Sequence, residues 1–170
     1  MSGCASHFRV IRVLLAASAM LVLTGAAAAQ DALTKMRAQY AAETKPVDKA
    51  KILAKLGPRE MNEIRRLLTA GEDEKALAVL QQYRDWVHST TQELIASGID
   101  ASRRSGGFKE LQISLRMFIR RLDDVVFTLQ QDVRASFRAV RADLESDESA
   151  LIDALFPVRT PRRPASTSSK

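Results

Sequence analysis

Cysteine is almost absent from this chain. The 170 residues include a single cysteine, Cys4, which lies near the amino terminus and upstream of the first apolar run. The remainder of the chain has no thiol for a disulfide, a nucleophilic thiolate or a sulfur ligand to a metal. The fold must therefore be stabilised by the packing of apolar side chains.

Histidine and the common catalytic motifs are also scarce. Beyond residue 29 the only histidine is His88, and the chain has no G-x-S-x-G, no H-E-x-x-H and no Glu-x-x-His pair. These absences disfavour hydrolytic triads, zinc sites and di-metal bundles. An enzyme would have to use Glu60, Glu63, His88 or Asp123, and we rank that hypothesis last. We expect no cofactor, no metal and no small-molecule substrate.

Aromatic residues make up 5% of the chain, too few for a base-stacking platform. The formal charge of +6 comes from the two ends, because residues 30–156 hold 20 basic and 20 acidic side chains. The excess positive charge lies in Arg9 and Arg12 at one end and in Arg159, Arg162, Arg163 and Lys170 at the other. A neutral central part argues against nucleic acid as a partner.

The first 29 residues have the pattern of a secretory signal. Arg9 and Arg12 precede an uncharged apolar run at residues 13–23, and three alanines at residues 27–29 provide a cleavage site after Ala29. The alternative, an uncleaved membrane anchor, is disfavoured because the run is short for a spanning helix. We therefore expect a periplasmic or secreted protein, exported by the general secretion route.

Residues 30–156 predict an all-α domain, a compact and mostly antiparallel bundle of about five or six helices. No alternating run of β-branched residues is long enough for a strand, and each glycine or proline falls where a helical pattern starts or stops. Gly57 and Pro58 predict the end of one helix and the start of another. Helical patterns cover residues 30–43, 46–56, 58–70, 72–97 and 107–129. A sixth pattern starts near Asp132 and leads into a short last helix that starts at Ser146 or Ser149.

The strongest periodic signal lies in residues 107–144. Seven apolar residues follow steps of three and four, which places them on one stripe of a helix: Phe108, Leu111, Leu115, Phe118, Leu122, Val125 and Leu129. The helix at residues 72–97 is the expected partner of this stripe. The rhythm slips at residues 130–132, which predicts a break there, with Asp132 capping the next helix.

Residues 67–77 resemble the turn of a tetratricopeptide helix pair, in which an alanine and a leucine pack in the second helix. No second copy follows at the spacing of about 34 residues that such repeats require. We therefore predict an ordinary helical hairpin.

Basic side chains are concentrated in residues 103–141, which hold nine of them against four acidic ones. Two groups fall on single helix faces and are candidates to hold an anionic partner: Arg116 with Arg120, and Arg134 with Arg138 and Arg141. The alternative, which we favour, is a solvated face neutralised by acidic residues of neighbouring helices.

These observations favour an exported, non-enzymatic protein of the bacterial cell envelope, acting as a protein-binding scaffold, adaptor or regulator. A periplasmic chaperone or stress protein is the alternative. The partner is expected to be another envelope protein. Residues 157–170 predict a disordered basic tail, whose Arg159, Arg162, Arg163 and Lys170 are candidate contacts to an anionic envelope surface.

Overall fold

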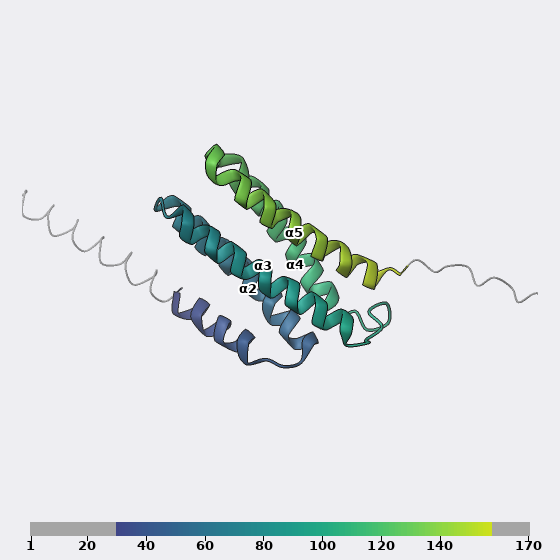
Figure 1. Cartoon of the computed structure of the whole chain (residues 1–170). Coiled ribbons are helices and arrows are strands. Elements are labelled where there is room, and N and C mark those ends of the chain that lie inside the picture. The colour runs from purple at the N-terminus through teal and green to yellow at the C-terminus, as the bar shows by residue number, and fades with distance from the viewer. Residues whose placement is uncertain (1–29, 158–170) are drawn as a thin grey trace, which may run out of the picture. The chain divides into compact units, whose positions relative to one another are not determined.

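The computed structural model describes residues 30–157, which contain five helices and no strand (Figure 1). The all-α prediction is confirmed. The chain divides into two compact units after residue 42; the described part of the first unit is a helix at residues 30–42. The predicted signal at residues 1–29 and the tail contacts Arg159, Arg162, Arg163 and Lys170 lie outside the described residues.

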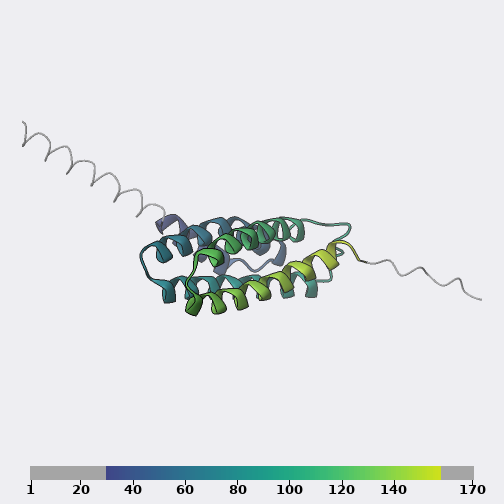
Figure 2. The ribbon, with the colours of Figure 1, turned by 90° about the horizontal axis from the view of Figure 1, so that it is seen from above.

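The second unit contains four long helices: α2 (Pro46–Thr69), α3 (Asp73–Ala96), α4 (Phe108–Thr128) and α5 (Gln131–Leu155). Helices α2 and α5 each lie beside both α3 and α4. The result is two layers, α2 with α4 and α3 with α5, which Figure 2 views from above. Consecutive helices run antiparallel, so the two helices within each layer run parallel.

The hairpin between α2 and α3 closes at Gly71. Its φ of +74° is a left-handed conformation that favours glycine. The amide of Gly71 donates to the carbonyl of Leu68, and the amide of Glu72 donates to that of Leu67. This pair of bonds is the Schellman arrangement, which satisfies the last carbonyls of α2. The predicted hairpin at residues 67–77 therefore forms.

The apolar stripe of α4 is buried along its whole length, with Leu129 at its end the most exposed at 9%. Its main neighbours are α2 and α5, whereas α3 lies diagonally opposite. The helix at residues 72–97, predicted as the partner of the stripe, is therefore not its main neighbour. One contact does cross the diagonal: the rings of Tyr83 and Phe118 stack with their centroids 4.3 Å apart.

The predicted helix boundary at Gly57 and Pro58 is wrong, because α2 continues through both residues. A proline inside a helix leaves the carbonyl four residues earlier without its usual donor. Here that acceptor is Ala54, and the hydroxyl of Ser114 on α4 donates to it at 2.7 Å. Helix α4 therefore supplies the hydrogen bond that Pro58 removes from α2.

The break after Leu129 is confirmed, since α4 ends at Thr128 and α5 begins at Gln131. The cap is Gln130 rather than Asp132, which lies in the first turn. The short last helix is also wrong, because α5 runs unbroken past Ser146 and Ser149. Its buried residues Leu144, Asp147 and Leu151 keep helical spacing, so the aspartate occupies a position on the apolar stripe.

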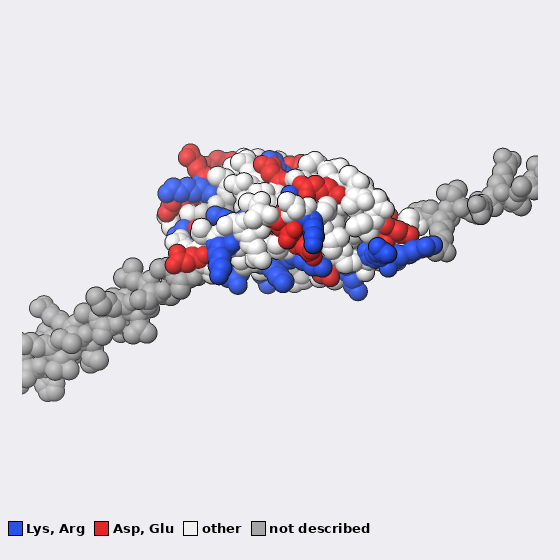
Figure 3. All heavy atoms as spheres, turned by 90° about the horizontal axis from the view of Figure 1, so that it is seen from below, with Lys and Arg blue, Asp and Glu red and all other residues white. Residues whose placement is uncertain are grey.

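The two layers carry opposite charge. Helices α2 and α4 hold ten basic and six acidic side chains, whereas α3 and α5 hold five basic and ten acidic ones. In Figure 3 basic side chains gather along the lower edge, and acidic ones are more frequent above. The neutral total of residues 30–156 therefore hides a separation of charge between two faces.

Candidate functional site

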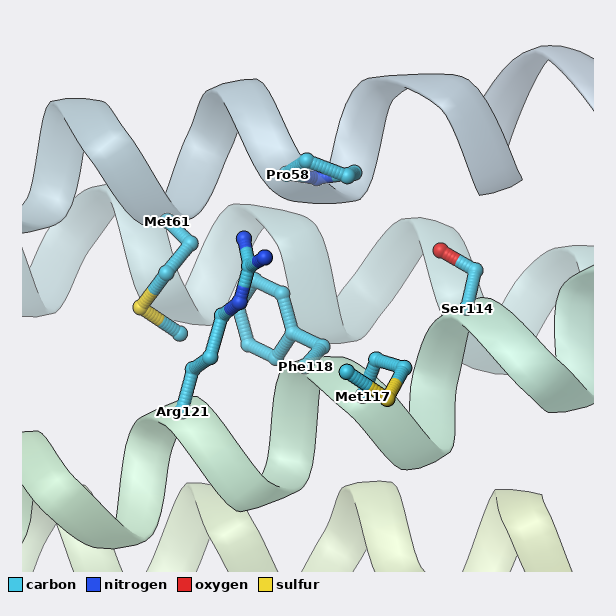
Figure 4. A pocket seen from close by; sticks show the side chains of 6 residues that line it. All are labelled: Pro58, Met61, Ser114, Met117, Phe118 and Arg121. Carbon is cyan, nitrogen blue, oxygen red and sulfur yellow. The ribbon is translucent and has the colours of Figure 1, made fainter.

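A hollow of about 180 Å³ lies between α2 and α4 at the level of Pro58. Its lining is mostly apolar and comes from both helices: Pro58 and Met61 from α2, and Ser114, Met117, Phe118 and Arg121 from α4. Figure 4 shows the Arg121 side chain extending from α4 beside the Phe118 ring towards α2. The hollow thus combines an apolar floor with a cationic group.

The backbone around the hollow is held in place by the same residues that allow Pro58 inside α2. Ser114 fixes α4 to α2 through its bond to Ala54. A Cβ at Gly57 would come within 2.6 Å of the Tyr83 hydroxyl oxygen and 3.3 Å of the Ser114 hydroxyl oxygen, so glycine is the residue that leaves room for both side chains. The walls of the hollow are therefore set by close helix contacts.

Apolar surface continues from the hollow along α4. The side chain of Met117 is 45% exposed, and that of Ile113, one helical turn earlier, is 50% exposed. Residues four apart in a helix lie on the same face. Exposed apolar side chains beside an apolar hollow are typical of a surface that binds another protein.

The two helices that form the hollow carry several cations without a carboxylate partner, and one of them, Arg121, lines the hollow. Four of the ten basic residues of α2 and α4 form ion pairs within residues 30–157. The other six make none there: Lys55, Arg59, Arg65, Lys109, Arg120 and Arg121. Unpaired cations beside an apolar hollow favour a ligand that carries both an apolar group and negative charge.

The arginines predicted as an anionic-partner face are divided between two helices and differ in their surroundings. Arg116 lies 3.9 Å from Glu148, and Arg141 pairs with Asp123 and Glu145. Arg134 donates to the Leu129 carbonyl, where it helps to close the α4–α5 turn. Arg120 and Arg138 are exposed.

The carboxylates named for an enzymatic hypothesis do not meet His88. Glu60 is fully buried in α2, Glu63 pairs with Arg66 at 2.8 Å, and Asp123 pairs with Arg141. His88 instead lies against Asp147 of α5, with its Nδ1 3.0 Å from the carboxylate Oδ1. Sequence reasoning missed this pair, and the one available signal was the position of Asp147 on an apolar stripe.

Comparison with protein-family models, curated proteins and solved structures finds no match to this chain. Within residues 30–157, no helix is both long and apolar enough to cross a membrane. The same residues contain no group of three histidine or acidic side chains placed to hold a metal ion.

Proposed function

We propose that this protein is a non-enzymatic protein-binding module of the bacterial cell envelope, a scaffold, adaptor or regulator. The observation that supports the proposal is the hollow at Pro58, with exposed Met117 beside it and unpaired Arg121 at its edge. An apolar anchor that fills a pocket supplies most of the energy of many protein interfaces.

The lining indicates which partner would fit. One apolar side chain would enter the hollow and pack on Met61 and Phe118, while a carboxylate close to it in the partner would reach Arg121. The remaining unpaired cations of α2 and α4 would speed the approach of an acidic partner. We therefore expect an acidic segment with an exposed apolar residue.

Site-specific crosslinking in the envelope tests this function. A photoreactive p-benzoylphenylalanine in place of Met117 is expected to give one discrete adduct, and the same residue in place of exposed Asp153 on α5 should give none. Arg121→Glu should abolish the adduct, whereas Arg138→Glu, an equal change of charge on α5, should preserve it. The identified partner should then bind the purified protein with the same dependence on Arg121.

Other outcomes separate the alternatives. Loss of the adduct in Arg138→Glu but not in Arg121→Glu would indicate that the partner binds the predicted arginine face instead of the hollow. A ladder of many different adducts would favour the chaperone, which must accept many unfolded chains. Identical adducts from positions 117 and 153, or no adduct from either, would contradict the proposed function.

Export and the basic tail remain part of the proposal and rest on the sequence alone. Cleavage after Ala29 predicts a mature chain that begins at Gln30, which amino-terminal sequencing of the exported protein would check. Deleting residues 158–170 is expected to weaken salt-sensitive retention on anionic envelope surfaces. Unchanged retention would refute the proposed role of the tail.

A further inference from the structure

The face opposite the proposed partner surface has a second hollow, between α3 and α5. It measures about 340 Å³ and is lined entirely by polar or charged side chains: Arg84, Asp85, His88, Asp143, Ser146 and Asp147. Three of the six are aspartates, and this layer of the fold carries the excess of acidic residues.

Most charged groups in this hollow already have partners. The Arg84 guanidinium donates to Asp85 at 2.7 Å and to Asp143 at 3.2 Å. One oxygen of Asp147 lies 3.0 Å from Nδ1 of His88, a side chain that is 64% exposed. These contacts hold the walls of the hollow and leave one buried acceptor without a hydrogen-bond partner.

That acceptor is Oδ2 of Asp147. The residue is only 4% exposed, and within the described chain its Oδ2 has no hydrogen-bond partner. Burial raises the pKa of this carboxyl, and the hydrogen bond from His88 opposes that shift. A buried carboxylate oxygen without a donor costs free energy, and such groups are concentrated at functional sites.

We propose that the α3–α5 hollow is a second binding site, which takes a cationic side chain of a protein partner, a guanidinium or an ammonium, with Asp147 as its acceptor. Three aspartates against one arginine leave the hollow negative when His88 is neutral, so a cation is attracted. Oδ2 exposes almost no surface in the free chain, so the ligand reaches it by displacing a neighbouring side chain. Its N–H donor then supplies the hydrogen bond that Oδ2 lacks, and charge-assisted bonds of this kind are strong. Ser146 at the rim offers a further hydroxyl to the same ligand.

A pair of matched small probes tests the site without knowledge of the partner. N-acetyl-arginine methylamide carries a guanidinium, and N-acetyl-citrulline methylamide is its uncharged near-isostere. In a titration followed by ¹H–¹⁵N NMR of the full mature chain, arginine should shift signals of α3 and α5 around His88 and Asp147, saturably. Citrulline should bind at least about tenfold more weakly.

Two variants make the test specific. Asp147→Asn keeps the shape of the side chain and should weaken arginine binding about tenfold or more, whereas Asp153→Asn, an equal charge change at an exposed site of α5, should not. Ser146→Arg retains Asp147 but fills the hollow with a tethered guanidinium, and it should also block binding. This second variant keeps the test decisive if Asp147→Asn alters the fold.

Three results would overturn the proposal. These are equal responses to arginine and citrulline, arginine shifts spread over acidic residues outside the hollow, and arginine binding that survives both Asp147→Asn and Ser146→Arg. None of them bears on the crosslink from position 117, because that site lies in the other layer. The two proposals therefore fail independently.

Discussion

The hydroxyl of Ser114 on α4 donates to the carbonyl oxygen of Ala54 on α2, across 2.7 Å and 60 positions of sequence. Ala54 is the residue whose carbonyl loses its helical donor to Pro58. Helix α4 thus supplies the donor for the one carbonyl of α2 that Pro58 leaves without its helical hydrogen bond. The apolar hollow proposed for partner binding opens at this point.

Replacing Ser114 by alanine tests whether its hydroxyl compensates for the hydrogen bond that Pro58 removes. Ser114→Ala leaves the Ala54 carbonyl without a donor and is expected to lower the free energy of unfolding by about 1–3 kcal/mol. In a Pro58→Ala background the helical bond is restored, so the same change should cost much less. Urea denaturation followed by circular dichroism measures both, with exposed Ser136→Ala as the control. Equal costs in the two backgrounds would show that the Ser114 bond does not compensate for Pro58.

Gly57 and Tyr83 are a second close pair. Gly57→Ala would place a Cβ 2.6 Å from the Tyr83 hydroxyl, and we expect a loss of about 1–3 kcal/mol of unfolding free energy. Tyr83→Phe removes that hydroxyl, which is buried without a hydrogen-bond partner, and should by itself leave stability unchanged or slightly higher. The double variant should recover part of the loss. Thermal unfolding of the parent, the two single variants and the double variant measures this. If the two substitutions changed the unfolding free energy in a strictly additive way, the contact would be contradicted.

The raised pKa of Asp147 predicts that Asp147→Asn stabilises the folded protein to an extent that depends on pH. Burial raises its folded-state pKa above the ordinary value of 3.8, so ionisation of Asp147 opposes folding. The protonated Asp147 carboxyl makes its full contribution to the free energy of unfolding below that ordinary value. This contribution is lost as the pH rises through the folded-state pKa. Asp147→Asn is therefore expected to be more stable than the parent at neutral pH, by about 1 kcal/mol, and equal to it in acid. Urea denaturation from pH 3 to 7 measures this, with Asp153→Asn as the control. An Asp147→Asn variant less stable than the parent at pH 7 would contradict the prediction.

Lys49 and Glu93 predict a pH dependence of the opposite sign. The Lys49 ammonium contacts the Glu93 carboxylate at 2.8 Å and lowers the pKa of Glu93 below its ordinary 4.5. The stability from this pair is complete above that value and is lost as the pH falls through the lowered folded-state pKa. Because Glu93 is partly exposed, Lys49→Met should cost only about 0.5–1 kcal/mol at pH 7 and nothing in strong acid. A loss that does not vary with pH would indicate packing rather than charge.

Sequence periodicity predicted the helices where local signals decide the structure. The buried stripe of α4, the hairpin at Gly71 and the break after Leu129 all depend on residues within a few positions of one another. The predicted boundary at Pro58 was wrong because the compensating donor, Ser114, lies far along the chain. No local pattern carries that information.

The candidate sites show the same limit. Two serines flanking Asp147 and Glu148 favoured a helix start there, because serine caps helices and acidic residues are common in the first turn. Asp147 is instead buried within α5 and meets His88, 59 positions away. The basic residues of α2 and α4 were visible in the sequence, but their gathering into one layer follows from which helices become neighbours. Pairing between helices is a tertiary property, so it had to be observed.

The parallel layers have a consequence for how the protein folds. Contacts within each hairpin join residues close in sequence, whereas those between the hairpins, such as Ser114 with Ala54 and His88 with Asp147, join residues 60 and 59 apart. Local contacts form before distant ones because they close shorter loops. The hairpins should therefore form first, and their docking should set the overall rate. A link between residues 97 and 107 too short to let the two hairpins dock within one chain would favour docking onto the hairpin of a second molecule, giving an exchanged dimer.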